Sequence, residues 1–296
     1  MKNMIAILCV LMLTVKIFSS CCPTSGSIIP WSSYTYFYLD DRRPNGTGKA
    51  NCQNALAGLD YFFTPCFFAS LYGAYENTKN TSPLVGVNPP IRGERGYLHI
   101  EGTGGGISLN YLFSSGLEVY VDGSYLSYRQ NLTSRNKGAD TDFINNTRGH
   151  RWDFEGGVFY TFPTKCVTFI QNINYFYTSN HVKPSIDQFG NILTKQGAQF
   201  GSVNATTNLL FFPCFPVNLL VLGGLGYDSL RNVTFPISGI GPTQASFPLR
   251  PRFGWNVGAG IVVAFGRFSL FPVYVHTQRS GPIYADSVTI YGEMKF

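Results

Sequence analysis

The chain has 296 residues, of which 13% are charged and 16% aromatic, with 32 glycines, a net charge of +6 and a mean hydropathy of +0.02. So few charges exclude an ordinary soluble surface, and so many strand and turn formers argue against a helical protein. The basic residues form no run of five or more, which leaves nucleic-acid binding without an electrostatic basis.

Residues 1–20 are predicted to be a signal peptide, because Lys2 precedes an apolar run, Met4–Val15, that is too short for a stable bilayer anchor. No stretch of about 18 apolar residues follows, so we expect export without a transmembrane helix. Cys21, preceded by Phe18, resembles the cysteine of a loose bacterial lipobox, so lipidation of Cys21 stays open beside simple cleavage. Residues 21–32 are expected to form a short periplasmic N-terminal segment.

About twelve segments with strand character follow, and an even number is typical of bacterial outer-membrane barrels. We therefore predict an all-β fold, a transmembrane antiparallel up-and-down β-barrel over residues 33–296. The predicted strands span residues 33–39, 55–63, 67–77, 96–113, 116–131, 151–162, 167–178, 199–212, 217–230, 252–265, 268–279 and 286–296.

Within these segments large apolar residues alternate with Gly, Ser, Asn and a few charges. In residues 151–162, for example, Trp152 and Phe154 share one face while Asp153 and Glu155 share the other. That pattern favours lipid outside and a wet, narrow lumen inside. The charges expected to line the lumen are Asp60, Glu118, Asp122, Arg151, Asp153, Glu155, Arg252, Glu293 and Lys295, whose acidic excess leans toward cations if they are unpaired.

Short and long connections alternate along the chain, such as 64–66 followed by 78–95, and 163–166 followed by 179–198. Short periplasmic turns and longer extracellular loops give an outer-membrane barrel this asymmetry. The alternation predicts that both chain ends lie on the periplasmic rim. The chain ends on a strand pattern, so Phe296 is expected to close the last strand against the first.

The segments Ala55–Lys79 and Gly106–Tyr128 resemble the β-domain of autotransporters, in which paired strands with short turns repeat around a twelve-stranded barrel. The resemblance covers residues 55–296 and implies an outer-membrane barrel that meets outer-membrane lipid and the barrel-assembly machinery. Phe296 also resembles the terminal aromatic signal that this machinery recognises. Only residues 23–32 separate Cys22 from the first predicted strand, so we expect neither a passenger nor a plug helix, and self-secretion is not carried over.

Three cysteines, Cys66, Cys166 and Cys214, lie in or beside predicted turns on one rim. They are either small buried thiols or, in an oxidising compartment, partners in disulfides between neighbouring turns or with other envelope proteins. A cross-linked envelope of this kind resembles that of chlamydia-like bacteria.

An enzymatic role is not expected. The histidines His99, His150, His181 and His276 lie near the loop ends of their strands, and Asp140, Asp142 and Asp153 are near His150 in sequence. Histidine is, however, common where a barrel meets headgroups and water. No metal or cofactor motif is found, and the stretch Gly102–Gly106 (GTGGG) predicts a kink or bulge rather than a phosphate loop, which needs a following helix.

The sequence therefore predicts a porin-like channel or structural envelope protein. The alternatives left open are a surface adhesin or receptor that uses the long loops 78–95 and 179–198, and a hydrolase at the outer rim.

Overall fold

The computed structural model describes residues 23–41, 48–83, 95–135, 143–186, 192–193, 196–212, 216–236, 244–248, 252–280 and 283–295. The predicted signal peptide, Cys21, Cys214, Asp140, Asp142 and Phe296 lie outside these residues. No helix in the described part of the chain is both long and apolar enough to cross a membrane.

The described residues form fifteen strands. They are β1 (Ile28–Asp41), β2 (Gly48–Thr64), β3 (Phe67–Pro83), β4 (Arg95–Leu112), β5 (Leu117–Arg135), β6 (Phe143–Pro163), β7 (Val167–Val182), β8 (Ser185–Ile186), β9 (Ile192–Leu193), β10 (Gln196–Phe211), β11 (Val217–Pro236), β12 (Gln244–Pro248), β13 (Phe253–Phe265), β14 (Phe268–Arg279) and β15 (Ile283–Met294).

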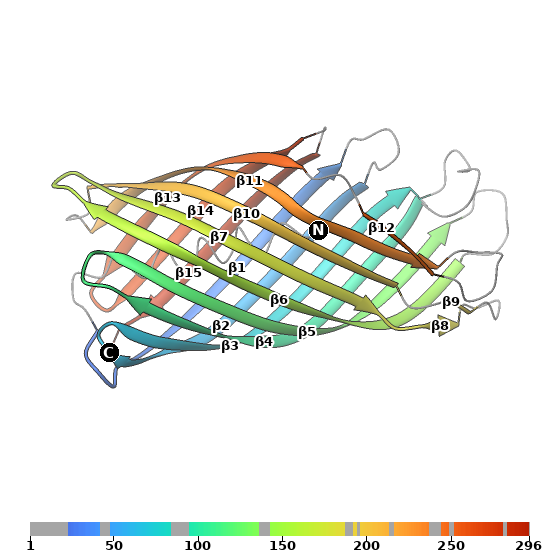
Figure 1. Cartoon of the computed structure of the whole chain (residues 1–296), viewed down its shortest axis with the longest axis horizontal. Helices are drawn as coiled ribbons and strands as arrows, with labels where there is room; N and C mark the ends of the chain where they lie inside the picture. The colour runs from blue at the N-terminus through green and yellow to red at the C-terminus, as the bar shows by residue number, and fades with distance from the viewer. Residues whose placement is uncertain are drawn as a thin grey trace.

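Twelve of these strands close into one antiparallel barrel, as the sequence predicts (Figure 1). The order is β1 to β7, then β10, β11, β13, β14 and β15, with β10 paired to β11 and β15 paired to β1. The three remaining strands are short: β12 extends the pairing of β11, and β8 pairs with β9. Because every barrel strand has two neighbours, no strand edge is left to face lipid.

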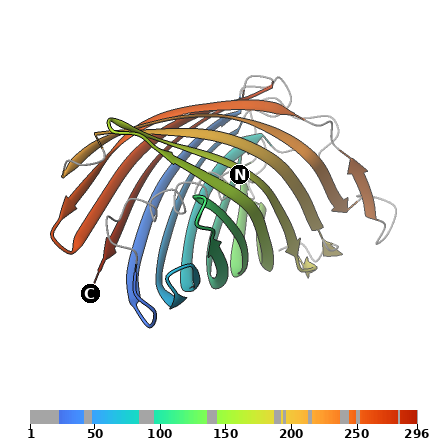
Figure 2. The same ribbon diagram turned by 60° about the vertical axis from the view of Figure 1, so that its left-hand side comes forward.

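Tight turns gather at one end of the barrel, as Figures 1 and 2 show, and at the other end longer stretches of sequence separate successive strands, such as β3 from β4 and β5 from β6. The β4–β5 turn uses Gly116 at φ 82°, and the β13–β14 turn uses Gly266 at φ 57°. Only glycine adopts such angles without steric cost, so these two positions allow the chain to reverse within a few residues. We call these two ends the turn rim and the loop rim.

Strands at the loop rim run further than the sequence predicts. β2 begins at Gly48 instead of Ala55, and β6 begins at Phe143 instead of Arg151. At the turn rim, β1 begins at Ile28 rather than Ser33, so pairing also starts inside the stretch assigned to an N-terminal segment. At the loop rim both faces of a strand meet polar surroundings, so the period-two apolar signal disappears although the hydrogen-bond ladder continues.

The outer surface carries an apolar band bounded by aromatic residues at both rims, as a lipid-facing barrel requires. Exposed aromatics toward the turn rim include Tyr61, Phe63, Tyr111, Phe113, Tyr160, Phe162, Phe265 and Phe268. Those toward the loop rim include Tyr36, Tyr75, Tyr125, Trp152, Tyr227 and Trp255.

The closing pair β1–β15 gives a direct test of the register. Tyr34 lies opposite Ile290 and both side chains point outward, whereas Thr289 points inward and donates or accepts a hydrogen bond of 2.9 Å with Thr35. In a background with the native cysteines changed to serine, Tyr34→Cys with Ile290→Cys is expected to form an intramolecular disulfide, seen as altered migration on a non-reducing gel. Tyr34→Cys with Thr289→Cys should not cross-link, and equal cross-linking of both pairs would contradict this register.

Candidate functional site

The inner wall of the barrel holds long side chains that lie flat, each across a glycine of the next strand. Trp31 on β1 is the clearest case: a Cβ on Gly58 of β2 would overlap its indole ring. The indole Nε1 donates a hydrogen bond of 2.8 Å to Oδ1 of Asp60, and Ser70 Oγ donates one of 2.6 Å to the same oxygen. Asp60 is thus held in the wall with its charge compensated by two donors.

The same arrangement explains the GTGGG stretch of β4. Tyr72 on β3 crosses Gly106 and donates a hydrogen bond of 2.8 Å from its hydroxyl to Asp122 of β5. The predicted kink or bulge is wrong, because Gly102–Gly106 pairs in continuous register with β3 and β5. The glycines are needed for close approach: a Cβ on Gly104 would overlap the Tyr125 carbonyl, and one on Gly106 the ring of Tyr72.

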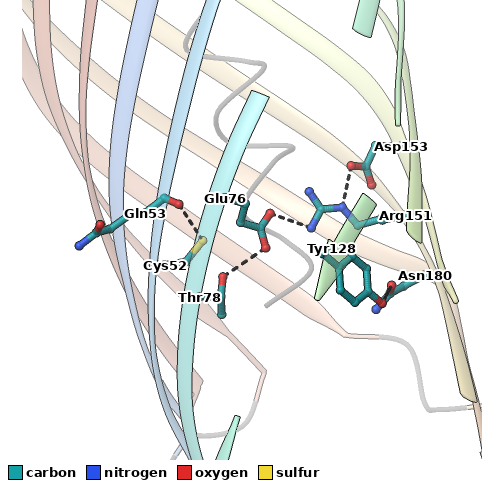
Figure 3. Close-up of polar contacts among 8 residues, drawn as sticks. All are labelled: Cys52, Gln53, Glu76, Thr78, Tyr128, Arg151, Asp153 and Asn180. Atoms are coloured by element: carbon teal, nitrogen blue, oxygen red, sulfur yellow. Dashed lines mark hydrogen bonds and ion pairs between the residues drawn. The ribbon is translucent and has the colours of Figure 1, made fainter. Parts of the chain in front are cut away.

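Two further tyrosines follow this rule. Tyr128 of β5 crosses Gly149 of β6, and its hydroxyl donates a 2.5 Å hydrogen bond to Asn180 Oδ1 of β7 (Figure 3). Tyr120 donates a 2.5 Å hydrogen bond to Glu155 Oε1, which also accepts one of 2.6 Å from Asn174. Each phenol therefore ends on an acceptor in the wall and not in the centre of the lumen.

The Arg151 bridge, which consists of Glu76, Arg151 and Asp153, connects strands that are not neighbours (Figure 3). Arg151 Nη1 lies 2.8 Å from Glu76 Oε2, and Arg151 Nε donates a hydrogen bond of 2.8 Å to Asp153 Oδ2. Glu76 is on β3 and Arg151 on β6, so the guanidinium spans the inner face of β4 and β5. Thr78 adds a hydrogen bond of 3.2 Å to Glu76 Oε1.

A second group of charges, the Asp228 cluster, consists of Asp228, Arg231 and Arg279. Arg279 Nη1 donates a hydrogen bond of 2.9 Å to Asp228 Oδ1, and Arg231 Nε lies 4.0 Å from Oδ2. The Arg279 side chain lies over Gly226 and Gly254, each too close for a Cβ. In the strand order β7 and β10 separate this cluster from the Arg151 bridge on one side, and β15, β1 and β2 on the other, so the two groups lie on opposite walls.

Among the described residues, five inward charges were not predicted from the sequence: Asp41, Glu76, Asp228, Arg231 and Arg279. Glu76 shares its parity with Ser70 and Tyr72, which is a signal that could have found it. Asp228 follows a segment that is apolar on both faces, and Arg231 lies beyond a bulge between β10 and β11 that reverses the parity of β11. Arg279 lies at the very end of β14, where alternation cannot be followed further.

The inner wall is also less polar than expected. A contiguous apolar strip lines the inside of eight consecutive strands from β10 round to β3. It is made of Leu210, Leu220, Leu222, Val262, Phe271, Val273, Val275, Tyr291 and Trp31, with Leu56 and Tyr72 packed against it. The expectation of an inner face of Gly, Ser, Asn and charges is therefore wrong for this wall, and on β4 to β7 the inward polar residues alternate with buried apolar ones such as Tyr120, Phe159 and Ile170.

The remaining predicted lumen residues also lie on the inner side. Glu118 and Glu293 are buried, and Lys295 Nζ lies 3.7 Å from Glu293 Oε1. Arg252 is half-buried just before β13, and its carbonyl accepts a 2.8 Å hydrogen bond from the Asp228 amide. The structure thus brings Arg252 to the Asp228 cluster, while Asp60, Glu118 and Glu293 are spread along the wall.

The described cysteines lie apart from these charges, except Cys52. Cys66 and Cys166 are exposed free thiols in the β2–β3 and β6–β7 turns, so both sit on the turn rim. Cys52 is buried, and its Sγ donates to the Gln53 carbonyl at 3.8 Å near the Arg151 bridge (Figure 3).

The four histidines do not meet at one place. On the outer face, the rings of His150 and His181 are tilted with respect to each other with their centroids 5.2 Å apart, and His181 Nε2 lies 3.0 Å from Ser179 Oγ. His276 Nδ1 lies 2.8 Å from Asp286, and His99 Nε2 lies 3.2 Å from Asn77. In the described part of the chain no group of three or more His, Cys, Asp or Glu residues is arranged to hold a metal ion.

No protein-family model and no curated protein matches the sequence. Solved structures do resemble the barrel. The translocator domain of autotransporter NalP from Neisseria meningitidis superposes with a TM-score of 0.71 at 12% identity, covering 99% of this chain and 98% of that one. The transport unit of autotransporter AIDA-I from Escherichia coli gives 0.64 at 10%, covering 91% and 90%. The β-domain of the Bordetella autotransporter BrkA gives 0.63 at 14%, covering 91% and 100%.

At these identities the likeness concerns the fold. The chain has the twelve-stranded fold of autotransporter translocator domains, which confirms the resemblance found in its sequence and makes it an outer-membrane β-barrel in architecture.

The glycine positions on the inner wall predict the cost of adding a methyl group. In Gly106→Ala the added Cβ would lie 2.7 Å from the Gly123 carbonyl oxygen and would overlap the ring of Tyr72. The substitution should therefore lower the free energy of unfolding by about 1–3 kcal/mol. Gly73→Ala, on the outer face with its nearest atom at 4.0 Å, should be close to neutral. Urea unfolding of the refolded barrels measures both, and equal stability of the two variants would contradict the close approach at Gly106.

Proposed function

We propose that this protein is a porin-like channel of the outer membrane, with a narrow lumen for small solutes. The observation that carries the proposal is the flat packing of Trp31, Tyr72, Tyr128 and Arg279 over glycines, which keeps the longest inward side chains against the wall. Had these side chains extended toward the axis, a twelve-stranded barrel would be filled from side to side.

The charges give the lumen a transverse polarity. Carboxylates of Asp60, Asp122 and Glu155 occur on β2 to β6, whereas arginines gather around Asp228 on the opposite side. Fixed charges of opposite sign on facing walls orient dipolar solutes, and their balance sets ion preference. The apolar strip, which lines β10 round to β3, adds a surface for solutes that are partly apolar.

We further propose that the turn rim, where β1 begins and β15 ends, is periplasmic. The support is the difference in connection length between the two rims, because outer-membrane barrels keep short turns inside and longer loops outside. The contact with outer-membrane lipid that this placement entails fits the apolar band on the outer surface.

An adhesin role remains the alternative from the class of binding proteins. Residues 84–94, within the first proposed contact loop, lie outside the described residues, as do most of the residues between β8 and β10. Deleting residues 84–94 would abolish ligand binding by an adhesin and leave conductance of a channel in place.

A hydrolase built on Ser179 and His181 is disfavoured by the surroundings of the pair. Ser179 is 7% exposed, and its strand pairs with β6 on one side and β10 on the other. Backbone amides in a two-sided ladder are already committed, so they cannot form an oxyanion hole. We expect neither the Ser179→Ala variant nor the unchanged chain to release fatty acid from phospholipid vesicles faster than a protein-free control. Fatty-acid release that the substitution abolishes would contradict this and favour the hydrolase.

The Arg151 bridge gives the channel proposal its sharpest test. Arg151→Gln removes the cation that compensates Glu76 and Asp153, so the lumen becomes more negative and should shift toward cations. The measurement is the reversal potential of the refolded chain in planar bilayers under a salt gradient, after heat-modifiable migration confirms folding. Lys79→Gln, which removes an exposed cation from the outer face of β3, is the matched control and should leave the potential unchanged.

A folded wild-type barrel that never conducts would contradict the channel and leave a sealed envelope scaffold. Stable conductance with the same reversal potential in wild type and Arg151→Gln would contradict the placement of the bridge in the ion path.

A further inference from the structure

A row of cations crosses the outer face of β5, β6 and the end of β7 at the loop rim. Arg129 lies directly opposite Arg148 in the β5–β6 register. Lys183 follows directly after the end of β7, and its amide donates a 2.8 Å hydrogen bond to the Arg148 carbonyl. All three residues are exposed. We call Arg129, Arg148 and Lys183 the cation row.

The cation row lies at a defined depth relative to the apolar band. Along the outer face of β6, Phe162 and Trp152 are ten residues apart. At about 3.3 Å per residue and a tilt of about 40°, they bound an apolar band about 25 Å tall, the usual height for such barrels. Arg148 is four residues beyond Trp152, which places it about 10 Å outside that boundary, at the level of lipid headgroups.

Aromatic rings fill the space between the band and the cation row. Tyr125 and Trp152 have ring centroids 4.6 Å apart, Tyr125 and His150 6.1 Å, and His150 and His181 5.2 Å. Amphipathic rings of this kind prefer the boundary between acyl chains and headgroups. A lipid that packs its chains on Phe154 below would therefore carry its headgroup to the cation row.

Within the described residues, the charges of the two arginines in the cation row are not compensated by an ion pair. Two arginines directly opposite each other on neighbouring strands repel. In the part of the chain that the structure describes, neither guanidinium has a carboxylate within ion-pair distance. Glu101 is the one carboxylate in register with Arg129, and its Oε1 accepts a 3.1 Å hydrogen bond from Tyr75.

We infer that the cation row binds the phosphate group of a lipid headgroup in the leaflet at the loop rim. Guanidinium groups bind phosphate oxygens through paired hydrogen bonds, and two facing arginines with a lysine can surround one phosphate. The position of the row above the aromatic rings favours a phosphate that is attached to a membrane lipid over a free ion, since the acyl chains and the headgroup are engaged together. The site is on the outer face and is independent of whether the lumen conducts.

The test is a titration of phosphatidic acid into the refolded full chain in zwitterionic detergent, with bound lipid counted by native mass spectrometry. Arg129→Ala with Arg148→Ala should weaken binding about thirtyfold, because each basic residue at a membrane surface contributes roughly a factor of five. The matched control, Lys165→Ala with Arg267→Ala, removes two exposed cations from the turn rim and should bind as wild type does. Diacylglycerol with the same chains should bind weakly to all three proteins.

Equal loss of phosphatidic acid binding in both double variants would overturn the site, as would unchanged binding in Arg129→Ala with Arg148→Ala. Inorganic phosphate that displaces the lipid at equal concentration would overturn its assignment to a membrane lipid. If the double variant does not refold, Arg148→Gln alone replaces it, with about fivefold weaker binding expected and wild-type binding counting against the site.

Discussion

The absence of a Cβ at a few inner-wall positions is the constraint on which the interior of this barrel depends. Gly58, Gly106, Gly149 and Gly254 each lie beneath a long side chain of a neighbouring strand, and a methyl group at any of them would collide with it. Strand interiors normally disfavour glycine, because it gains no packing there and loses the most backbone freedom. Here the loss is offset by hydrogen bonds of the covering side chains: Trp31 bonds Asp60 on the strand of the glycine itself, and Tyr72, Tyr128 and Arg279 each bond a residue one strand further on.

Those hydrogen bonds decide how charge can be kept inside a narrow barrel. A buried carboxylate is tolerated only with donors or a cation beside it. Asp60 has Trp31 and Ser70, Asp122 has Tyr72, and Glu155 has Tyr120 and Asn174. The arginines follow the same logic, since Arg151 and Arg279 each lie against carboxylates. These charged groups are therefore compensated within the wall, which keeps charge in place without drawing the opposite walls together.

The fold could be predicted from the sequence because lipid imposes a strict period of two. Trp152 and Phe154 against Asp153 and Glu155 already identify the outer and inner faces of β6, and the alternation of turns and loops gives the antiparallel order. The strand ends could not be predicted, since beyond the lipid both faces of β2 and β6 are polar.

The grouping of the inner charges could not be predicted from the sequence, for a different reason. Parity places Arg151 on the inner face of β6. Its contact with Glu76 on β3 depends on closure of the barrel and on the glycines of β4, which leave room for the guanidinium to pass. On β11 the apolar inner strip hides the alternation, and the bulge near Asp228 then reverses it. The GTGGG stretch cannot be interpreted from its own strand alone, because its reason lies in Tyr72 of the neighbouring strand.

The central claim, a lumen kept open by side chains lying flat over glycines, is tested most directly by solute entry into proteoliposomes. Vesicles that contain the refolded chain are diluted into isotonic solutions of neutral solutes of increasing size, and swelling is followed by light scattering. The account predicts swelling with glycerol and with a pentose that falls steeply for a disaccharide. Swelling no faster than in protein-free vesicles, with a heat-modifiable folded barrel present, would contradict it.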